Sequence, residues 1–413
     1  MAEEAKMAPP LRFQGFSDAW EQRKFEEMLD KNDGVRRGPF GSSLKKEIFV
    51  ENSDYVVYEQ QNAIYDNYKT RYNISKEKFD ELHKFSLKEN DFIMSGAGTI
   101  GRISRVPKGI KPGVFNQALI RFRINSELTD PKYFLQFIRA ENMQRKLTGA
   151  NPGSAITNLV PMTEVKNWEI FVPAKAEQIK IGDFFKNLDN TIALHQQKQR
   201  QIRSLKQGFI KNLFPNNKNS APRIRFSIFN DDWNQRNASE IFTSVSDKNY
   251  PELPVLSASQ EKGMVLRESN GIDIKYDQKS TGTYKRVLPG QFVMHLRSFQ
   301  GGFAYSTIEG ITSPAYTILA FRNKEDHYPL FWKSIFSSKN FIKRLEAITY
   351  GIRDGRSISY ADFSTLRFWI PSYEEQKQIG DFIESIDATI AFYQRQIDMM
   401  QSLKKELLNK MFI

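Results

Sequence analysis

The stretch VPAKAEQIKIGDFFKNLDNTIA (172–193) returns 198 positions later as IPSYEEQKQIGDFIESIDATIA (370–391). Both copies keep one proline, the pair Glu-Gln and the triplet Ile-Gly-Asp at the same spacing. An earlier stretch, LRFQGFSDAWEQR (11–23), returns 213 positions later as IRFSIFNDDWNQR (224–236), with seven identities in register. Two such matches do not arise by chance, so the chain contains an internal duplication.

The copies differ between these matching stretches. VVYEQQ (56–61) aligns with VLSASQ (255–260), and NDFIMSG (90–96) aligns with GQFVMHL (290–296), so that apolar positions persist while polar residues change. The first copy also carries 15 extra residues, mostly near KNDGVRRGPFGSSLKKE (31–47). The pattern indicates a retained scaffold with a different polar surface on each copy.

The sequence pattern of each copy predicts a mixed α/β module. Residues 55–123 read as short strands that alternate or run apolar between Gly, Pro and Asn residues. DPKYFLQFIRAENMQRKL (130–147) has helical spacing and an Asp-Pro start suited to a helix N-terminus, and HYPLFWKSIFSSKNFIKRL (327–345) is its counterpart. Strands followed by a helix indicate one α/β module in each copy.

A long helix follows each module. Apolar residues step by alternating fours and threes, which is a heptad seam that requires a second helix against it. His195 and Gln199 interrupt the first seam, and we interpret them as polar positions that fix register. The apolar seam residues are Ile181, Phe185, Leu188, Ile192, Ile202, Leu205, Ile379, Ile383, Ile386, Ile390, Ile397 and Leu403.

The composition is that of a globular protein with two or three domains in 413 residues. Sixty basic and 48 acidic residues leave a net charge of +12, which suits a polyanionic partner but also occurs as incidental surface charge. The absence of cysteine excludes disulfides and thiolate metal sites. MAEEAKMAPP (1–10) lacks the order of a signal peptide and no apolar run approaches membrane-spanning length, so we expect a cytoplasmic protein.

We find no catalytic motif. GAGTIG (96–101) matches a dinucleotide fingerprint, but strand-like residues and Pro107 follow it where a helix should begin, which favours a turn. There is no P-loop and no Asp/Asn-Pro-Pro-aromatic signature, and the four histidines are scattered. Glu375-Gln376-Lys377 fits the end of a nuclease pattern, but Glu177-Gln178-Ile179 is its twin, so we interpret it as structural. We therefore expect no catalytic residue, no metal site and no cofactor in this chain.

The order module, E-Q-x-x-I-G-x-F helix, module and second such helix resembles the DNA-specificity subunits of Type I restriction-modification systems. The resemblance extends from about Leu11 to Ile413, and the paired unit openings and helix openings carry it. It implies an α+β fold, with two α/β target recognition domains in tandem pseudo-symmetric repeat separated by a two-helix antiparallel coiled coil. The implied domains are 11–165 (target recognition domain 1), 166–221 (first conserved helix and linker), 222–363 (target recognition domain 2) and 364–413 (second conserved helix).

The resemblance also implies a function. Such subunits are non-catalytic, and each target recognition domain reads one half of a bipartite DNA sequence. Two methyltransferase subunits dock on the frame and two motor-nuclease subunits join for restriction, so S-adenosylmethionine, ATP and Mg²⁺ belong to those partners. The helix from Glu177 to Phe214 has 38 residues, which corresponds to about 57 Å or some 17 base pairs at most.

Base recognition requires polar side chains that reach base edges while others hold phosphates. In the first copy we expect DNA contacts from Arg36, Arg37, Ser42, Ser43, Lys45, Lys46, Gln60, Gln61, Asn62, Ser95, Thr99, Arg102, Asn116, Gln117, Asn151, Ser154 and Asn158. In the second copy we expect them from Ser257, Ser259, Gln260, Lys262, Tyr284, Lys285, Arg286, His295, Arg297, Ser298, Tyr316, Arg353, Arg356 and Ser357.

Two other functions fit the sequence. A non-enzymatic scaffold whose two modules bind protein would share the duplication and the helix pairing. A nuclease or methyltransferase with an unfamiliar site would show activity from the chain alone. A steep negative dependence of binding on salt concentration distinguishes DNA binding from the first alternative.

Overall fold

The computed structural model describes residues 8–39, 43–149, 160–215, 220–259, 262–270, 278–295, 298–349 and 358–413. The chain divides into two compact units. Unit 1 contains Met1–His195 and Gln396–Ile413, and unit 2 contains Gln196–Arg395. Each unit therefore includes part of both long helices, whereas the sequence-based boundaries set the helix segments 166–221 and 364–413 apart from the modules.

Unit 1 contains two four-stranded sheets and a two-stranded pair. The first sheet has the order β2-β9-β6-β7 and is antiparallel. The second has the order β3-β5-β4-β8, in which only β4 and β8 are parallel. The strands are β1 (Glu21–Lys24), β2 (Val35–Arg37), β3 (Phe49–Val50), β4 (Tyr55–Tyr58), β5 (Tyr72–Ile74), β6 (Phe92–Ser95), β7 (Ile103–Arg105), β8 (Gly113–Phe115), β9 (Leu119–Phe122) and β10 (Glu169–Val172).

The helix expected at 130–147 is present but broken into two. Asp130 caps α3, since its carboxylate accepts from the backbone N–H groups of Lys132 and Tyr133, and Pro131 occupies the first turn. Ala140 is extended and ends α3, after which α4 begins. The helices of unit 1 before the long helix are α1 (Gln60–Tyr65), α2 (Lys76–Glu81), α3 (Pro131–Arg139), α4 (Glu141–Leu147) and α5 (Met162–Lys166), with 3-10 helices η2 (Phe25–Met28), η4 (Lys46–Ile48) and η5 (His83–Phe85).

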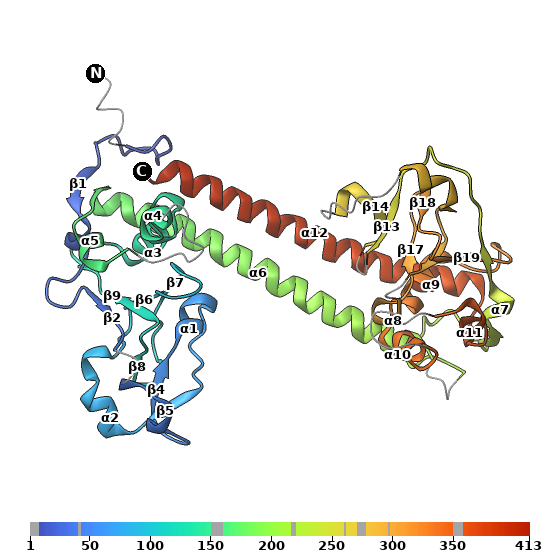
Figure 1. Ribbon diagram of the computed structural model, residues 1–413, viewed down its shortest axis with the longest axis horizontal. Coiled ribbons are helices and arrows are strands. Elements are labelled where there is room, and N and C mark those ends of the chain that lie inside the picture. Colours follow the sequence, from blue (N-terminus) through green and yellow to red (C-terminus); the bar gives the residue numbers. More distant parts are fainter. Residues whose placement is uncertain are drawn as a thin grey trace. The chain divides into compact units, whose positions relative to one another are not determined.

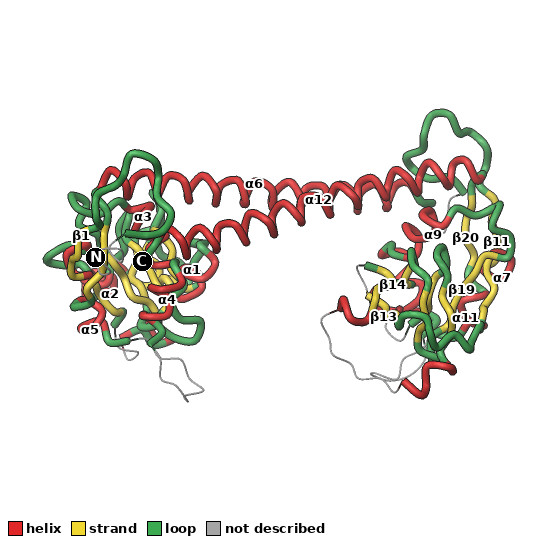
Figure 2. Tube along the Cα trace, turned by 90° about the horizontal axis from the view of Figure 1, so that it is seen from above, coloured by secondary structure: helices red, strands yellow, loops and turns green. Residues whose placement is uncertain are grey.

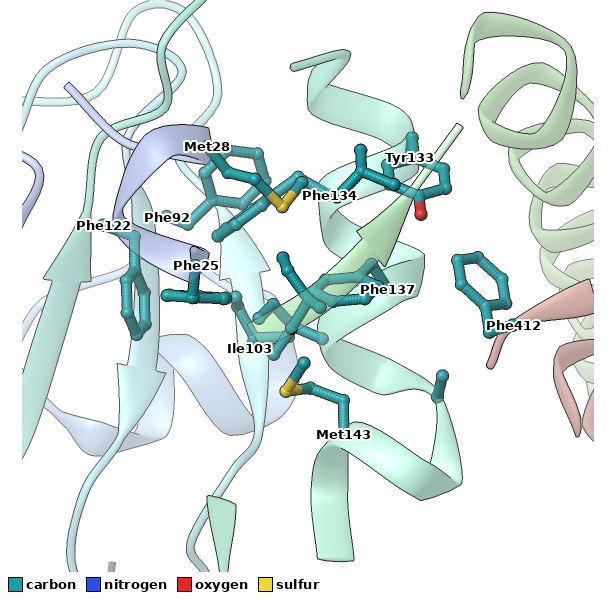
Figure 3. Packing of buried hydrophobic residues seen from close by; sticks show 14 of the residues in the cluster. Phe25, Met28, Phe92, Ile103, Phe122, Tyr133, Phe134, Phe137, Met143 and Phe412 are labelled. Atoms are coloured by element: carbon teal, nitrogen blue, oxygen red, sulfur yellow. The ribbon is translucent and has the colours of Figure 1, made fainter. Parts of the chain in front are cut away.

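The main core of unit 1 lies between the first sheet and α3 (Figure 3). Phe92 of β6 and Phe134 of α3 have ring centroids 4.9 Å apart, and Phe25 contacts Phe134 at 6.2 Å. Phe412, from the end of the chain, lies 5.4 Å from Tyr133 in the same core. Each such ring removes apolar area from water, which contributes about 1.5–3 kcal/mol.

Unit 2 repeats the first sheet and the two-stranded pair, and Figure 2 shows β11 beside β20. In place of the second four-stranded sheet, its described residues form the pairs β13-β14 and β15-β18. Its four-stranded sheet has the order β12-β19-β16-β17. The strands are β11 (Asn234–Asn237), β12 (Phe242–Val245), β13 (Leu256–Ser259), β14 (Gly263–Leu266), β15 (Lys285–Val287), β16 (Phe292–Met294), β17 (Ala304–Tyr305), β18 (Gly310–Thr312), β19 (Thr317–Phe321) and β20 (Arg367–Ile370). The shorter helices are α7 (Ala238–Ile241), α8 (Ser298–Gly301), α9 (Pro329–Phe336), α10 (Lys339–Ala347) and α11 (Tyr360–Ser364), with 3-10 helices η6 (Arg267–Asn270) and η7 (Gln278–Thr283).

Strand register confirms the duplication residue by residue. β1 pairs with β10 so that Glu21 lies opposite Val172. β11 pairs with β20 so that Asn234 lies opposite Ile370. These partners differ by 213 and 198 positions, the two offsets found in the sequence. The α+β class and the tandem repeat are confirmed.

The two long helices are α6 (Lys175–Leu213) and α12 (Tyr373–Met411), each of 39 residues and unbroken in Figure 1. Within unit 1, Lys404 donates to Asp189 at 2.7 Å and Phe412 lies 6.1 Å from Phe185. Within unit 2, Lys206 donates to Asp387 at 2.5 Å. In unit 2, Gln199 also donates to the Ile390 carbonyl at 3.3 Å. In each unit the contacts of later residues in one helix are made with earlier residues of the other, so both pairings are antiparallel.

The expected seam is buried over most of its length but not throughout. Leu205 and Leu403 are 59% and 46% exposed, and Lys206 and Lys404 occupy the interface in their place. A strict heptad pattern drifts by about 20° per heptad around a straight α-helix, so the seam moves one residue along. Gln199 is buried and donates to the carbonyl of Ile390 at 3.3 Å, consistent with a polar seam position. The remaining expected seam residues, Ile181, Phe185, Leu188, Ile192, Ile202, Ile379, Ile383, Ile386, Ile390 and Ile397, are buried or half-buried.

Candidate nucleic-acid interface

The Glu-Gln pair that opens each long helix is a structural device. Glu177 is buried and accepts from Arg12 at 2.7 and 2.9 Å, and the hydrogen bond raises the pKa of Arg12 although burial opposes it. Glu375 binds Arg225 in the same way, at 2.8 Å. Its role is therefore to hold the start of unit 2 on α12, which agrees with the structural interpretation of Glu375.

The glutamine positions the chain that enters the next helix. Gln178 accepts from the Asp130 N–H at 2.9 Å and donates to the carbonyls of Leu128 and Pro173 at 3.0 Å. Gln376 makes the same contacts with the Tyr328 N–H and with the carbonyls at Asp326 and Pro371. The repeated motif therefore fixes the sheet and helices of each unit onto its long helix.

The motif glycine allows a close helix contact. A Cβ at Gly182 would lie 2.7 Å from the backbone nitrogen of Tyr133, and one at Gly380 would lie 2.8 Å from that of Phe331. Tyr133 and Phe331 are equivalent positions in α3 and α9. No larger residue fits at either place without displacing the neighbouring helix.

One end of the first sheet gathers several of the expected DNA contacts. The Gly38 N–H donates to the Leu119 carbonyl at 3.0 Å, and the Gly96 N–H donates to the Ala118 carbonyl at 2.8 Å. The Asn116 N–H donates to the Tyr58 carbonyl at 2.9 Å, which brings the start of α1 to the same place. We call this end of the sheet the unit 1 edge, and it consists of Arg37, Gln60, residues 95–102 and residues 116–118.

Four side chains are exposed on or beside the turns of the unit 1 edge. Arg37, Thr99, Arg102 and Gln117 are all exposed. Gln60 is half-buried, and its side-chain amide donates to the Ala97 carbonyl, which ties α1 to the GAGTIG loop. This loop is a turn between β6 and β7, as the sequence predicts. A backbone-supported loop with exposed polar side chains can follow a DNA groove.

Other candidates of the first copy have structural roles. Ser95 is fully buried, and its hydroxyl donates to the Thr99 carbonyl and accepts from the Arg102 N–H. Asn62 is 1% exposed and donates to the carbonyls of Asn67 and Lys69. We remove both from the proposed contacts, because a buried and saturated side chain cannot reach a base. Asn116 accepts from the Ala118 N–H and so shapes the edge turn.

The remaining first-copy candidates lie away from this edge or are engaged. Arg36 pairs with Asp33 at 2.7 Å, and Gln61 donates to Glu59 at 3.4 Å. Lys45 and Lys46 are exposed at η4, which leads into the second sheet, and half-buried Ser43 precedes them. Ser42, Asn151, Ser154 and Asn158 lie outside the described residues.

Asp33 belongs to a basic cluster that the sequence pattern does not reveal. It binds the buried Arg121 and the neighbouring Arg123, and Arg123 also binds Asp91 at 2.7 Å. Burial alone would raise the pKa of Asp33, but Arg36, Arg121 and Arg123 together lower it. Arg121 lies in the strand sequence ALIRFRI (118–124), in which apolar and basic residues alternate. Such alternation normally predicts an exposed arginine, but Arg121 is buried.

The equivalent end of the unit 2 sheet has different side chains. His295 follows β16 and Tyr316 precedes β19, and their rings lie 6.1 Å apart. Lys285 donates to the Tyr316 carbonyl at 2.6 Å, and burial followed by the charge of Lys248 lowers its pKa. Buried Ser298 accepts from the His295 N–H at 2.8 Å and so shapes the turn. We call His295, Ser298, Tyr316 and Lys285 the unit 2 edge.

The other second-copy candidates are scattered. Ser257 accepts from Arg267 at 3.4 Å, and Arg286 binds Glu309 and Asp247 at 2.6 and 3.4 Å. Lys262 is exposed at the turn between β13 and β14, near Ser259, and Tyr284 is half-buried before β15. Gln260, Arg297, Arg353, Arg356 and Ser357 lie outside the described residues.

Within the described ranges, no three histidine, aspartate or glutamate side chains are grouped so as to hold a metal ion. Among the same residues, every helix is too short or too polar to cross a lipid bilayer. The edges instead offer hydrogen-bond donors and acceptors on backbone-supported turns.

Known proteins share this sequence pattern and fold. Residues 18–204 match the protein family described as Type I restriction modification DNA specificity domain. The chain is similar in structure to the Type-I restriction-modification system S subunit from M. genitalium, with 16% identity over 98% of this chain and 99% of that chain and a TM-score of 0.58. A structure described as the basis of complex assembly and conformational transition of the type I R-M system has 15% identity over 95% and 97% of the two chains and a TM-score of 0.55. No curated protein matches the chain in sequence.

Proposed function

We propose that the chain is a Type I restriction-modification DNA-specificity subunit, since residues 18–204 match the domain of that family, and that each of its two units reads one half of a bipartite DNA sequence. The protein is a non-catalytic DNA-recognition subunit whose partners are DNA and the other subunits of a restriction-modification complex. The family itself requires no cofactor in this subunit.

The observation that carries the proposal is the contrast between equivalent sheet edges. Unit 1 exposes Arg102 and Gln117 beside its edge turns, and unit 2 has His295 and Tyr316 at the corresponding turns. Arginine can pair bidentately with guanine and glutamine with adenine. Two related scaffolds that differ at the same polar edge support two different half-sites.

The long helices supply a spacing element in this proposal. α6 has 39 residues and is therefore about 58 Å long. A helix pair of fixed length sets a fixed number of uncontacted base pairs between two half-sites. Shortening both helices by one heptad is then expected to shorten the spacer in methylated sites.

The full complex is proposed from the family. Two methyltransferase subunits and two motor-nuclease subunits join this chain, and these partners use S-adenosylmethionine, ATP and Mg²⁺. A complex that methylates the host chromosome and cleaves unmethylated DNA works where this DNA lies, and we propose a cytoplasmic location. Methylation of the host DNA is the readout that reports both half-sites at once.

The deciding experiment exchanges residues 24–165 for the equivalent segment of another family member. Methylome sequencing of a host that carries the hybrid and its methyltransferase is expected to show one changed half-site and one unchanged half-site. A change in both half-sites, or in neither, would overturn the division into one unit per half-site.

Single substitutions refine the exchange. Arg102→Ala is expected to weaken recognition at one half-site by about 1–3 kcal/mol per lost base contact, with binding measured against salt concentration. Lys76→Ala is the matched control, because Lys76 is exposed on α2 and pairs with Asp80 away from the edge. Binding that does not depend on salt would instead indicate a protein-binding scaffold.

A further inference from the structure

Unit 2 contains a groove of about 800 Å³ between the end of α6, α10 and β20. Its floor is aromatic, with Phe341 and Phe368 buried and Phe214 and Trp369 half-buried. We call it the α10 groove. Its volume suits several residues of a peptide rather than a single ion or water.

The rim of the α10 groove is basic. Arg344 is held over the ring of Phe368 at 4.9 Å and donates to the Arg367 carbonyl. None of the described lining residues is acidic, and no carboxylate among the described residues forms an ion pair with the rim cations. The rim cations are Lys211, Lys339, Lys343, Arg344 and Arg367.

The ends of the two long helices carry equivalent aromatic residues that are buried to different extents. Phe412 is the counterpart of Phe214, 198 positions later, and is only 4% exposed against Tyr133 and Phe185. Met411 beside it is 3% exposed. In unit 2, Phe214 lies 5.4 Å from Phe331, the counterpart of Tyr133, but it stays half-buried and lines the groove.

The charges at equivalent positions are also reversed. In unit 1, Asn409 donates to Glu141 at 3.1 Å and so joins the end of α12 to α4. The counterparts in unit 2 are Lys211 and Lys339, two exposed cations that both line the α10 groove. Glu169 of β10 likewise corresponds to Arg367 of β20. A place that is closed by a hydrogen bond in unit 1 is open and positive in unit 2.

We propose that the α10 groove binds an acidic peptide segment of a partner protein. One or two apolar side chains of the segment cover the aromatic floor, where Phe214 is half-buried although its counterpart Phe412 is buried. Its carboxylates pair with Lys211, Lys339 and Arg367 at the rim. An apolar anchor surrounded by complementary charge is a common mode of peptide recognition.

Other possible ligands complement either the aromatic floor or the basic rim of the groove, but not both. A DNA backbone would neutralise the rim, but it has no apolar group to cover Phe341, Phe368 and Trp369. A second copy of this chain carries a net charge of +12, so long-range repulsion opposes its approach to a basic groove. An acidic segment with an apolar anchor satisfies both the floor and the rim.

The test uses the full chain and a fluorescent peptide of about twelve residues, made of glutamate with leucine and phenylalanine at i, i+3, i+4 and i+7. The informative variant is Lys211→Asn with Lys339→Glu, which introduces the pair that closes the place in unit 1. The matched control is Lys108→Asn with Lys324→Glu, the same charge change at two exposed lysines outside the groove. Thermal unfolding checks that both variants are folded.

We expect salt-dependent binding that falls about tenfold or more in the groove variant and little in the control variant. Peptides with lysine for glutamate, or alanine for the apolar residues, are expected to bind far more weakly. Equal binding by both variants, or no binding, would overturn the proposal. Displacement of the peptide by a short DNA duplex would assign the groove to nucleic acid, and loss of a dimer in sedimentation of the groove variant would assign it to self-association; either result would also overturn it.

Discussion

Unit 1 and unit 2 keep the same contacts where their long helices begin and differ where their sheets end. Arg12 with Glu177, and Arg225 with Glu375, are the same ion pair at 2.7 and 2.8 Å. The unit 1 edge presents exposed Thr99 and Arg102, whereas the unit 2 edge is built around His295 and Tyr316. The comparison separates residues that hold the fold, which are identical, from residues available for recognition, which are not.

The largest expected effect comes from breaking the shared ion pairs. Glu177→Ala leaves a half-buried Arg12 without its carboxylate and is expected to cost about 3 kcal/mol, and Glu375→Ala is expected to cost a similar amount through Arg225. Denaturant unfolding measures the loss in the free energy of unfolding, and hydrogen exchange by mass spectrometry shows which unit loses stability. Each variant should lose protection in its own unit, and an equal loss in both units would contradict their independence.

The next effect concerns the motif glycines. Gly182→Ala and Gly380→Ala push a Cβ against the backbone of α3 or α9 and are expected to cost about 1–3 kcal/mol each. Gly208→Ala is the control on α6, because nothing lies within 4 Å of its Cβ position. That change should stabilise the helix by up to about 1 kcal/mol, and a loss of melting temperature there would contradict the packing argument.

A smaller effect should distinguish the two Lys-Asp pairs between the long helices. Asp189 accepts hydrogen bonds from Lys404 and Gln136 and lies 3.7 Å from Arg139. Asp387 accepts a hydrogen bond from Lys206. Asp189→Asn is therefore expected to cost about 1–2 kcal/mol, and Asp387→Asn about 1 kcal/mol or less. Chemical denaturation of the two variants measures the order, and the reverse order would show that Gln136 and Arg139 contribute nothing.

The smallest effect depends on pH. The hydrogen bond from Tyr328 lowers the pKa of Asp381, burial opposes this, and Lys377 assists. A carboxylate with a lowered folded pKa stabilises the fold above its unfolded pKa of about 4, and that contribution disappears as pH falls through the folded pKa. Tyr328→Phe should lower the melting temperature of unit 2 at pH 6, and the difference should shrink as the pH falls below about 4. A difference in melting temperature that does not change with pH would contradict the link between Tyr328 and the ionisation of Asp381. In unit 1 the matching carboxylate, Asp183, pairs with Lys132 instead.

Much of the fold can be predicted from the sequence because the stretches that occur twice mark contacts that both units make. The Asp130-Pro131 helix start and the identical Glu-Gln pairs are local signals with a clear physical meaning. The break at Ala140 has no such signal, since alanine favours helix and only tertiary packing makes it extended here. The prediction that Leu205 and Leu403 lie in the seam is wrong, because a seven-residue pattern does not report its drift around a real helix.

The recognition surface can be predicted only as a region. Polar residue type selects Thr99, Arg102 and Gln117, which are exposed beside one sheet edge, but also selects Asn62 and Ser95, which are buried. Whether an asparagine faces solvent or caps a turn depends on the backbone a few residues away, and no local pattern encodes it. The α10 groove is invisible in the sequence for a related reason, since it results from where two distant segments end.

Unit 1 draws on both extremes of the chain. The Leu11 N–H donates to the Lys410 carbonyl at 3.1 Å, and Phe412 completes a core that begins with Trp20 and Phe25. Unit 2 is continuous from Gln196 to Arg395. During translation, the last core residues of unit 1 are therefore synthesised after the whole of unit 2, so the core of unit 1 cannot be completed before unit 2 has been made.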